Sequence, residues 1–151
     1  MFCFQCQETA GNKGCTKVGV CGKNENTANS QDLLIYVTKG LSEVVNKIGE
    51  VDSKYYDLIS NNMFVTITNA NFDEEDILRK VEETIKAKDK LIKENKIENL
   101  SDAAKYTSDD RDELKRKAIE VGVLNIINED ERSLVELVTY GLKGMAAYNH
   151  H

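Results

Sequence analysis

Proline is absent from this sequence of 151 residues, and no cysteine follows position 21. Globular proteins contain about 5% proline, so its absence points away from a loop-rich β protein and toward long helices. No run of about 18 apolar residues occurs, which excludes a transmembrane helix by the usual length criterion. The first residues also lack the charged segment followed by an apolar one that marks a secretory signal. We therefore expect a cytoplasmic protein with no membrane partner.

Excess positive charge is also missing. The chain has 20 Lys and Arg against 26 Asp and Glu, which gives a net charge of −6. Binding to nucleic acid through a basic surface requires clustered Lys and Arg, so this class of partner is excluded. The chain is 40% hydrophobic, and at this length it can form one domain with a sizeable core.

Apolar residues spaced by three and four predict an all-α fold. The predicted helices cover about residues 30–48, 73–95, 108–122 and 128–148. The segment 63–68 is β-branched and alternating, which favours a strand locally. A single strand would have no partner to pair with, so we expect helix across residues 52–68.

Two of these predicted helices share a short sequence. Residues 32–41 (DLLIYVTKGL) and 133–142 (SLVELVTYGL) are identical at five of ten positions. Chance similarity between two amphipathic helices is one interpretation. The other is a duplicated packing unit, in which Gly40 and Gly141 let neighbouring helices approach closely.

All four cysteines lie in the first 22 residues, spaced Cys3-x2-Cys6-x8-Cys15-x5-Cys21, together with four of the nine glycines. Disulfides would require an oxidising compartment. A four-cysteine zinc site is chemically reasonable, although zinc ribbons place two Cys-x2-Cys pairs further apart. An iron–sulfur cluster fits best, because clusters accept thiolates from a short glycine-rich loop with irregular spacing. Glycine amides could also donate hydrogen bonds to the sulfur atoms.

The residues around these cysteines resemble the hybrid cluster protein family, also called hydroxylamine reductase or prismane protein and related to carbon monoxide dehydrogenases. The resemblance begins with MFCFQCQETA and GCTKVGVCGK and continues through QDLLIYVTKG (31–40) and TNANFD (68–73). It extends through RSL (132–134) to YGLKGMAAY (140–148), and so covers nearly the whole chain.

The resemblance implies that Cys3, Cys6, Cys15 and Cys21 bind a [4Fe–4S] cluster, since the short x8 and x5 gaps match the family members that carry a cubane. It also implies an all-α domain, with an irregular cluster-binding loop at residues 1–29 and a helical bundle at 30–151. Family members are several times longer, and later domains supply the Cys, Glu and His ligands of their hybrid cluster. We therefore expect this chain to be the N-terminal electron-relay part of such an oxidoreductase.

The expected partners are a redox electron donor and the remaining domains of the full-length enzyme. Reduction of hydroxylamine to ammonia, or reaction with nitric oxide, would belong to that enzyme, and the 151 residues alone are expected to be inactive. The alternative function is a non-redox helical interaction module, either without metal or with structural zinc on the four cysteines.

No residue of the chain is expected to be catalytic. His150 and His151 are the only histidines, lie at the terminus, and are either native residues or part of a tag. The acidic clusters at residues 74–76 and 109–113 are expected to begin helices, where negative charge complements the helix dipole. One lysine series is expected to form a solvated face, with docking of an acidic electron donor as the alternative: Lys86, Lys88, Lys90, Lys93 and Lys96.

Overall fold

The computed structural model describes residues 1–67 and 70–150. Within these residues every regular element is a helix, which confirms the all-α prediction. In chain order they are η1 (Ala10–Asn12), α1 (Glu25–Ile48), α2 (Ser53–Val65), α3 (Glu74–Asn95), α4 (Asp102–Lys105), α5 (Arg111–Glu120), η2 (Val123–Asn125) and α6 (Glu129–His150). The remaining regular contact is an isolated antiparallel bridge between Cys3 and Cys15.

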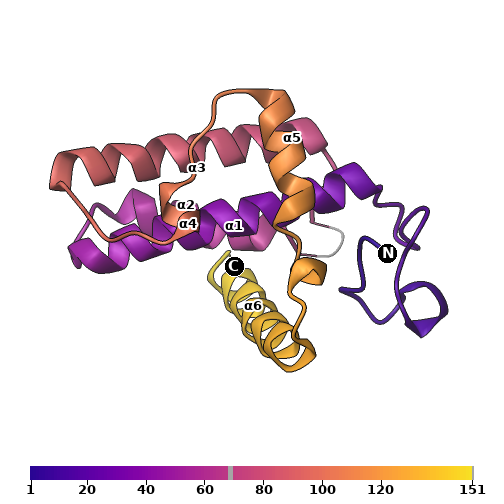
Figure 1. The fold of residues 1–151 in the computed structure, drawn as a ribbon. Coiled ribbons are helices and arrows are strands. Elements are labelled where there is room, and N and C mark those ends of the chain that lie inside the picture. The colour runs from indigo at the N-terminus through magenta and orange to yellow at the C-terminus, as the bar shows by residue number, and fades with distance from the viewer. Residues whose placement is uncertain (68–69, 151) are drawn as a thin grey trace.

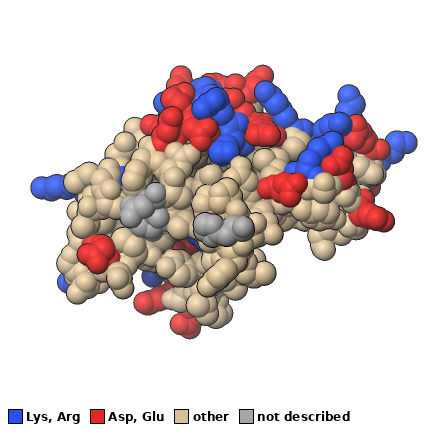
Figure 2. Space-filling model, turned by 180° about the vertical axis from the view of Figure 1, so that it is seen from behind, with Lys and Arg blue, Asp and Glu red and all other residues tan. Residues whose placement is uncertain are grey.

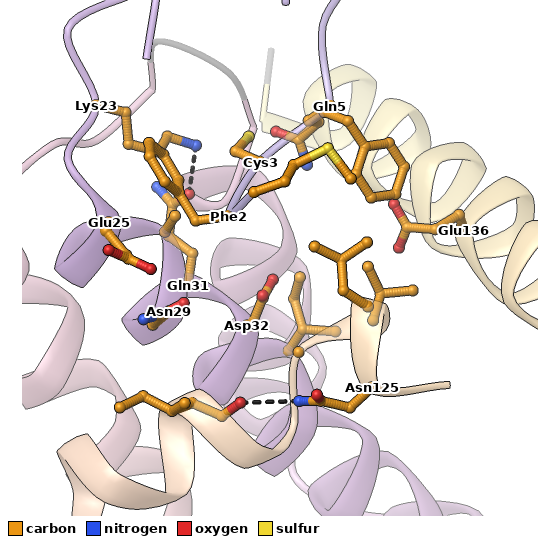
Figure 3. Close-up of a pocket in the computed structure, with 18 of the residues that line it drawn as sticks. Phe2, Cys3, Gln5, Lys23, Glu25, Asn29, Gln31, Asp32, Asn125 and Glu136 are labelled. Carbon is orange, nitrogen blue, oxygen red and sulfur yellow. Dashed lines mark hydrogen bonds between the residues drawn. The ribbon is translucent and has the colours of Figure 1, made fainter. Parts of the chain in front are cut away.

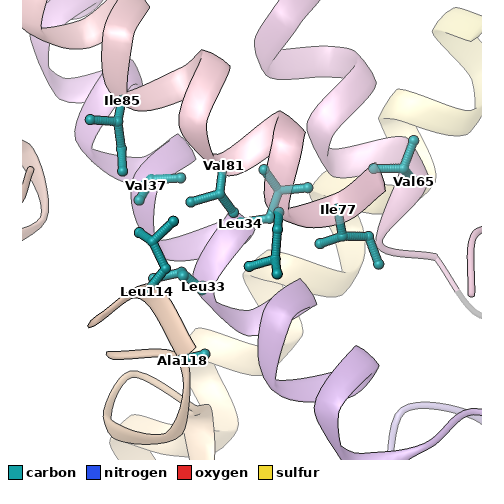
Figure 4. Packing of buried hydrophobic residues seen from close by; sticks show 10 residues of the cluster. Leu33, Leu34, Val37, Val65, Ile77, Val81, Ile85, Leu114 and Ala118 are labelled. Carbon is teal, nitrogen blue, oxygen red and sulfur yellow. The ribbon is translucent and has the colours of Figure 1, made fainter. Parts of the chain in front are cut away.

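Helix α1 is the centre of the fold. It lies along α3 and also contacts α2, α4 and α5, while α6 packs mainly on α2 (Figure 1). One end of the core joins α1, α3 and α5 through residues that are almost fully excluded from solvent (Figure 4). These residues are Leu33, Leu34, Val37, Val65, Ile77, Leu78, Val81, Ile85, Leu114 and Ala118. A second cluster at the other end of α1 is built from Leu41, Val44, Val45, Tyr55, Leu91 and Ala104.

The start of α1 differs from the prediction. The helix begins at Glu25, five residues before the expected start at Ser30, because Asn24 caps it. The Asn24 side-chain oxygen accepts a hydrogen bond from the backbone amide of Thr27 at 2.7 Å, as expected of an N-cap. The first turn carries few apolar side chains, so periodicity alone could not detect it. The predicted division between residues 29 and 30 therefore falls inside α1.

The ambiguous segment after α1 is helical as far as Val65, so the predicted helix over residues 52–68 is correct except at its two ends. Asp52 caps α2, and the helix continues to Val65 before Thr66 ends it. The strand alternative is thus wrong for residues 63–67, since Met63 and Val65 point into the helical core instead. Thr68, the last residue of that alternative, lies outside the described residues. Packing of α2 against α1 and α6 outweighs the local β preference of these residues.

The acidic clusters do begin helices. Asp73 caps α3 through the amides of Glu75 and Asp76, and Asp110 caps α5, which is shorter at both ends than the predicted 108–122. Asn128 caps α6, accepting a hydrogen bond from the Glu131 amide at 3.0 Å. Some of these acidic residues also form ion pairs that link one helix to another.

Arg111 of α5 makes ion pairs with Glu75, at 3.0 Å, and with Glu82 of α3. Lys115 of α5 lies 3.8 Å from Glu74. These carboxylates therefore link α3 to α5 by ion pairs.

The shared sequence predicted the same packing role for Gly40 and Gly141, and the structure supports this role at only one of them. A Cβ atom added to Gly40 would lie 2.3 Å from the backbone oxygen of Ala103, so this glycine does allow α4 to approach α1 closely. A Cβ atom added to Gly141 would meet no atom within 4 Å in the described structure. The idea of a shared packing role for the two glycines therefore holds at Gly40 alone.

The lysine face on α3 also needs a correction. Lys88 is fully buried and pairs with Asp89, so it does not belong to a solvated face. The helix turns this side chain inward because position 88 lies one turn beyond the buried Thr84 and next to Leu91 on the same face.

Candidate iron–sulfur loop and its polar cavity

The N-terminal loop is folded back on itself by two of the four cysteines. The Cys15 amide donates to the Cys3 carbonyl at 2.7 Å, and the Phe2 amide donates to the Cys15 carbonyl at 2.9 Å. Residues 3 and 15 therefore face one another across a short antiparallel bridge. The chain between them turns through η1, whose Ala10 carbonyl accepts hydrogen bonds from Lys13 and Gly14.

The thiol of Cys15 lies in a setting that favours the thiolate. Backbone amides of Ala10 and Val20 hydrogen-bond the sulfur and lower the pKa of Cys15, and the Thr9 hydroxyl lies 3.7 Å from it. Donation of N–H groups to a sulfur stabilises negative charge on that sulfur. All four cysteines are free thiols, so the loop holds no disulfide.

The thiol of Cys3 behaves differently. Burial raises the pKa of Cys3, while the amide of Gln5 and the charge of Lys23 oppose this shift. The negative charge of a Cys15 thiolate also raises the pKa of Cys3, which places the two thiols within electrostatic reach of each other. A cation beside the two thiols would favour ionisation of both.

Cys6 and Cys21 are not gathered with this pair. Among residues 1–67 and 70–150, no three Cys, His, Asp or Glu side chains converge as ligands of a metal ion. Both residues are nevertheless only partly exposed and lie on the same loop. A Cβ atom at Gly19 would lie 3.2 Å from the Cys21 sulfur and 2.9 Å from the Lys23 carbonyl, so glycine leaves space beside that sulfur. The donor set fits an iron–sulfur cluster in ligand type and in amide supply.

The loop is anchored to the helices by an apolar contact and a polar chain. Phe2, Cys15 and Ala28 of α1 form a small buried cluster. Lys23 is buried and donates to the side-chain oxygen of Gln31 at 2.6 Å, and Gln31 donates in turn to the Asn71 carbonyl at 2.9 Å. The position of the loop therefore depends on α1 and on the segment before α3.

A polar cavity of about 230 Å³ lies beside Cys3, between the loop, α1, η2 and α6 (Figure 3). Asp32 of α1 points into it from one side and Glu136 of α6 from the other, and Lys143 of α6 also lines it. Burial raises the pKa of Asp32 to about 7, although the Lys143 charge opposes the shift. Burial lowers the pKa of Lys143 to about 8, and Asp32 opposes that shift in the same way.

These cavity residues were not found by sequence analysis. Lys143 donates to the Thr66 carbonyl at 3.3 Å and is almost fully buried. One feature of the sequence could have indicated the cavity. Gln31 and Asp32 directly precede the buried Leu33 and Leu34, so polar residues occur near the buried face of α1. Periodicity does not show which distant helix a polar residue will meet.

A loop with four thiols followed by an all-α body also occurs in known proteins. The Prismane/CO dehydrogenase family profile matches residues 1–151. The chain belongs to the Prismane/CO dehydrogenase family. Its relatives include the hydroxylamine reductase of Acetivibrio thermocellus, 49% identical over 156 residues, and that of Clostridium perfringens, 50% identical over 161 residues. The hydroxylamine reductase of Methanocaldococcus jannaschii is 46% identical over 155 residues.

Each of these matches covers the whole of this prismane-family chain but only 28 to 29% of the relative. The matched part is the N-terminal part of the relatives. This confirms the family resemblance given by the cysteine loop. No helix within residues 1–67 and 70–150 of this family member has the length and apolar character needed to cross a membrane.

Proposed function

We propose that the chain is the N-terminal [4Fe–4S] electron-relay domain of a hydroxylamine reductase. Cys3, Cys6, Cys15 and Cys21 would bind the cluster. Residues 1–29 would form the cluster-binding part and residues 30–151 the helical bundle that supports it. When bound, such a cluster accepts and releases one electron at low potential.

One observation carries this proposal: the Cys15 sulfur receives backbone amides from two separate turns of the loop, at Ala10 and Val20. Amides directed at a sulfur are the means by which a protein stabilises the charge of a thiolate-bound cluster and sets its potential. This arrangement favours a metal-bound thiolate over a neutral thiol at Cys15.

The surrounding residues would hold and shield the thiolates. Phe2 and Ala28 exclude water on one side of Cys15, and the buried Lys23 supplies positive charge near Cys3 and Cys15. Lower water access and nearby positive charge both act on the stability of a reduced, more negative cluster. The Lys23 side chain is held in place by Gln31, so α1 sets the position of its charge.

The complete enzyme would contain further domains that correspond to the larger part of the relatives. In that enzyme the relay would take electrons from a redox donor and pass them to the site that reduces hydroxylamine to ammonia or acts on nitric oxide. We place it in the cytoplasm, where thiols remain reduced and available to iron. The 151 residues alone would not carry out the reduction, because no cysteine follows Cys21 to build a second cluster.

Anaerobic purification tests the relay function. The protein should be brown, absorb broadly near about 400 nm, and contain about four iron and four sulfide per chain. Colourless protein with about one equivalent of zinc would support the interaction-module alternative and reject the relay.

A pair of variants makes the test specific to the ligands. Cys15→Ser should lose the cluster, or change its absorption and iron content, while the helical circular dichroism stays largely intact. Val20→Ala is the matched control: its side chain is exposed, and the substitution keeps the amide that reaches Cys15. Equal iron in both variants and the parent would show that Cys15 is not a ligand.

A further inference from the structure

Helix α6 turns its more polar face toward the rest of the molecule and its apolar face toward solvent. The buried residues of this helix are Thr139, Lys143 and Ala146. Its end is fixed on α2 by contacts in which polar groups take part: Asn149 donates to the Ser60 hydroxyl at 3.0 Å, and His150 stacks on Phe64 with ring centroids 4.1 Å apart. This arrangement is the reverse of an ordinary surface helix.

The opposite side of α6 carries a continuous row of exposed apolar positions, which we call the α6 seam. It consists of Leu134, Val138, Gly141, Met145 and Tyr148. The side chains of Leu134, Met145 and Tyr148 are 63%, 69% and 88% exposed. No charged residue interrupts the seam, because Glu136 and Lys143 face the polar cavity instead. An apolar patch of this extent, along one helix, marks an interaction surface.

The spacing within the α6 seam indicates what kind of surface it fits. Successive members are four, three, four and three residues apart, which is the pattern of a helix that packs along another helix. Gly141 lies at the middle of the seam, and its open space would allow the partner backbone to come close. In Figure 2 charged side chains gather over the edge formed by α3, and the neighbouring surface is mostly free of them.

The length of the relatives indicates which partner covers the α6 seam. Relatives that match this chain over its whole length continue for more than twice that length beyond the matched part. Their additional polypeptide follows directly after the region that corresponds to α6. A segment joined to the end of α6 would be present at high effective concentration beside the seam.

We propose that the α6 seam binds an apolar helix of the polypeptide that follows the matched region in the longer relatives. This inference deepens the proposed function, because it names the surface through which the relay domain joins the rest of the enzyme. Burying the seam would also cover α6 on the side away from the cavity, so that α6 would be held from both sides.

A chimera tests the proposal: residues 1–151 of this chain followed by the remaining part of the Acetivibrio thermocellus relative. Hydroxyl-radical oxidation, read by mass spectrometry, would report the accessibility of Met145 and Tyr148 in the isolated chain and in the chimera. We expect oxidation of both to fall by about fivefold or more in the chimera, as for side chains in the dry centre of an interface. Phe72, exposed on another part of the surface, should be unchanged. Equal oxidation of the seam residues in both proteins would overturn the proposal.

Two substitutions give a second readout. Val138→Asp places a charge in the seam, and Ser133→Asp places one on an exposed position of α6 beside it. Val138→Asp should leave the melting temperature of the isolated chain unchanged but lower that of the chimera by about 5 °C or more. Ser133→Asp should change neither. If Val138→Asp lowers the melting temperature of the isolated chain as much as that of the chimera, the seam is already covered in the isolated chain, and the proposal is rejected.

Other outcomes are also decisive. A dimer of the isolated chain in which Met145 and Tyr148 are protected as fully as in the chimera would assign the seam to a second copy. Failure of the chimera to accumulate as soluble protein, repeated with the Clostridium perfringens relative, would likewise reject the proposal. The relay function is tested separately, since a Cys15→Ser chimera with about four fewer iron atoms per chain than the parent chimera should keep the seam protected. Equal iron content in the two chimeras, with the seam protected in both, would reject Cys15 as a cluster ligand and leave the seam proposal standing.

Discussion

Asp32 is a partly buried carboxyl group whose ionisation opposes folding, and replacing it with asparagine should make the protein more stable at neutral and alkaline pH. Burial in the cavity beside Cys3 raises the pKa of Asp32 from 3.8 to about 7. In the unfolded chain the same group ionises near its usual value. Between these two pKa values the folded protein binds a proton that the unfolded chain has lost, so stability falls as the pH rises through this range.

The magnitude follows from the size of the shift. Each pKa unit corresponds to about 1.4 kcal/mol, so a shift of about three units would cost at most about 4 kcal/mol above pH 7. Asp32 lines a cavity that water can enter, and we discount this value to about 2 kcal/mol. The attraction between Asp32 and Lys143 is already included, because it acts on the same pKa.

Urea unfolding followed by circular dichroism measures the effect. Asp32→Asn should raise the free energy of unfolding by about 2 kcal/mol at pH 8 and change it by less than about 0.5 kcal/mol at pH 4, where the aspartate is protonated in the folded protein. Asp57→Asn, at an exposed position of α2, should have little effect at either pH. An Asp32→Asn variant that is equally stabilised at both pH values, or destabilised at pH 8, would refute the assignment of the cost to ionisation.

Four further predictions concern packing and activity. Gly40→Ala should lower the free energy of unfolding by about 2 kcal/mol, because the new Cβ atom collides with the backbone of α4. Gly141→Ala should raise the same quantity in the isolated chain by about 0.5 to 1 kcal/mol through helix propensity, and an identical response at both sites would contradict this packing. Asn62→Ala should cost about 2 kcal/mol in urea unfolding, since the buried Asn62 amide donates to the hydroxyls of Thr38 and Thr84, and an unchanged midpoint would argue against that network. The isolated chain should not reduce hydroxylamine with an artificial electron donor in an ammonia assay, whereas turnover comparable to that of a full-length relative would show that the 151 residues contain the reaction site.

Helices could be predicted wherever the apolar positions repeat with a helical period. Asp73 and Asn128 gave correct starts for α3 and α6, because an acidic or amide side chain at that place caps a helix by local hydrogen bonds. The first turn of α1 was missed because residues 25–29 are polar and are stabilised by the Asn24 cap and by contacts with distant segments. Local information is enough where the cap and the apolar stripe coincide.

The candidate site was predictable as a set of cysteines but not as an arrangement. Spacing indicated four thiol ligands, while the pairing of Cys3 with Cys15 depends on a reversal of the chain that no periodicity marks. The cavity is even harder to predict from sequence, since Asp32 and Lys143 come from helices that meet only in the folded protein. Burial of Lys88 shows the same limit, because a lysine among charged neighbours gives no local sign of being inside.

The cavity beside Cys3 has a consequence for the order in which the protein is made. Its walls come from the first residues of the chain and from Glu136 and Lys143 near its end. At about 5 to 20 residues per second, a ribosome needs about 7 to 28 s to synthesise the chain from Cys3 to Lys143. For most of that time Cys3 lacks the wall of the cavity that α6 provides. The cavity therefore takes its final form only after α6 has been synthesised and has packed against the rest of the chain.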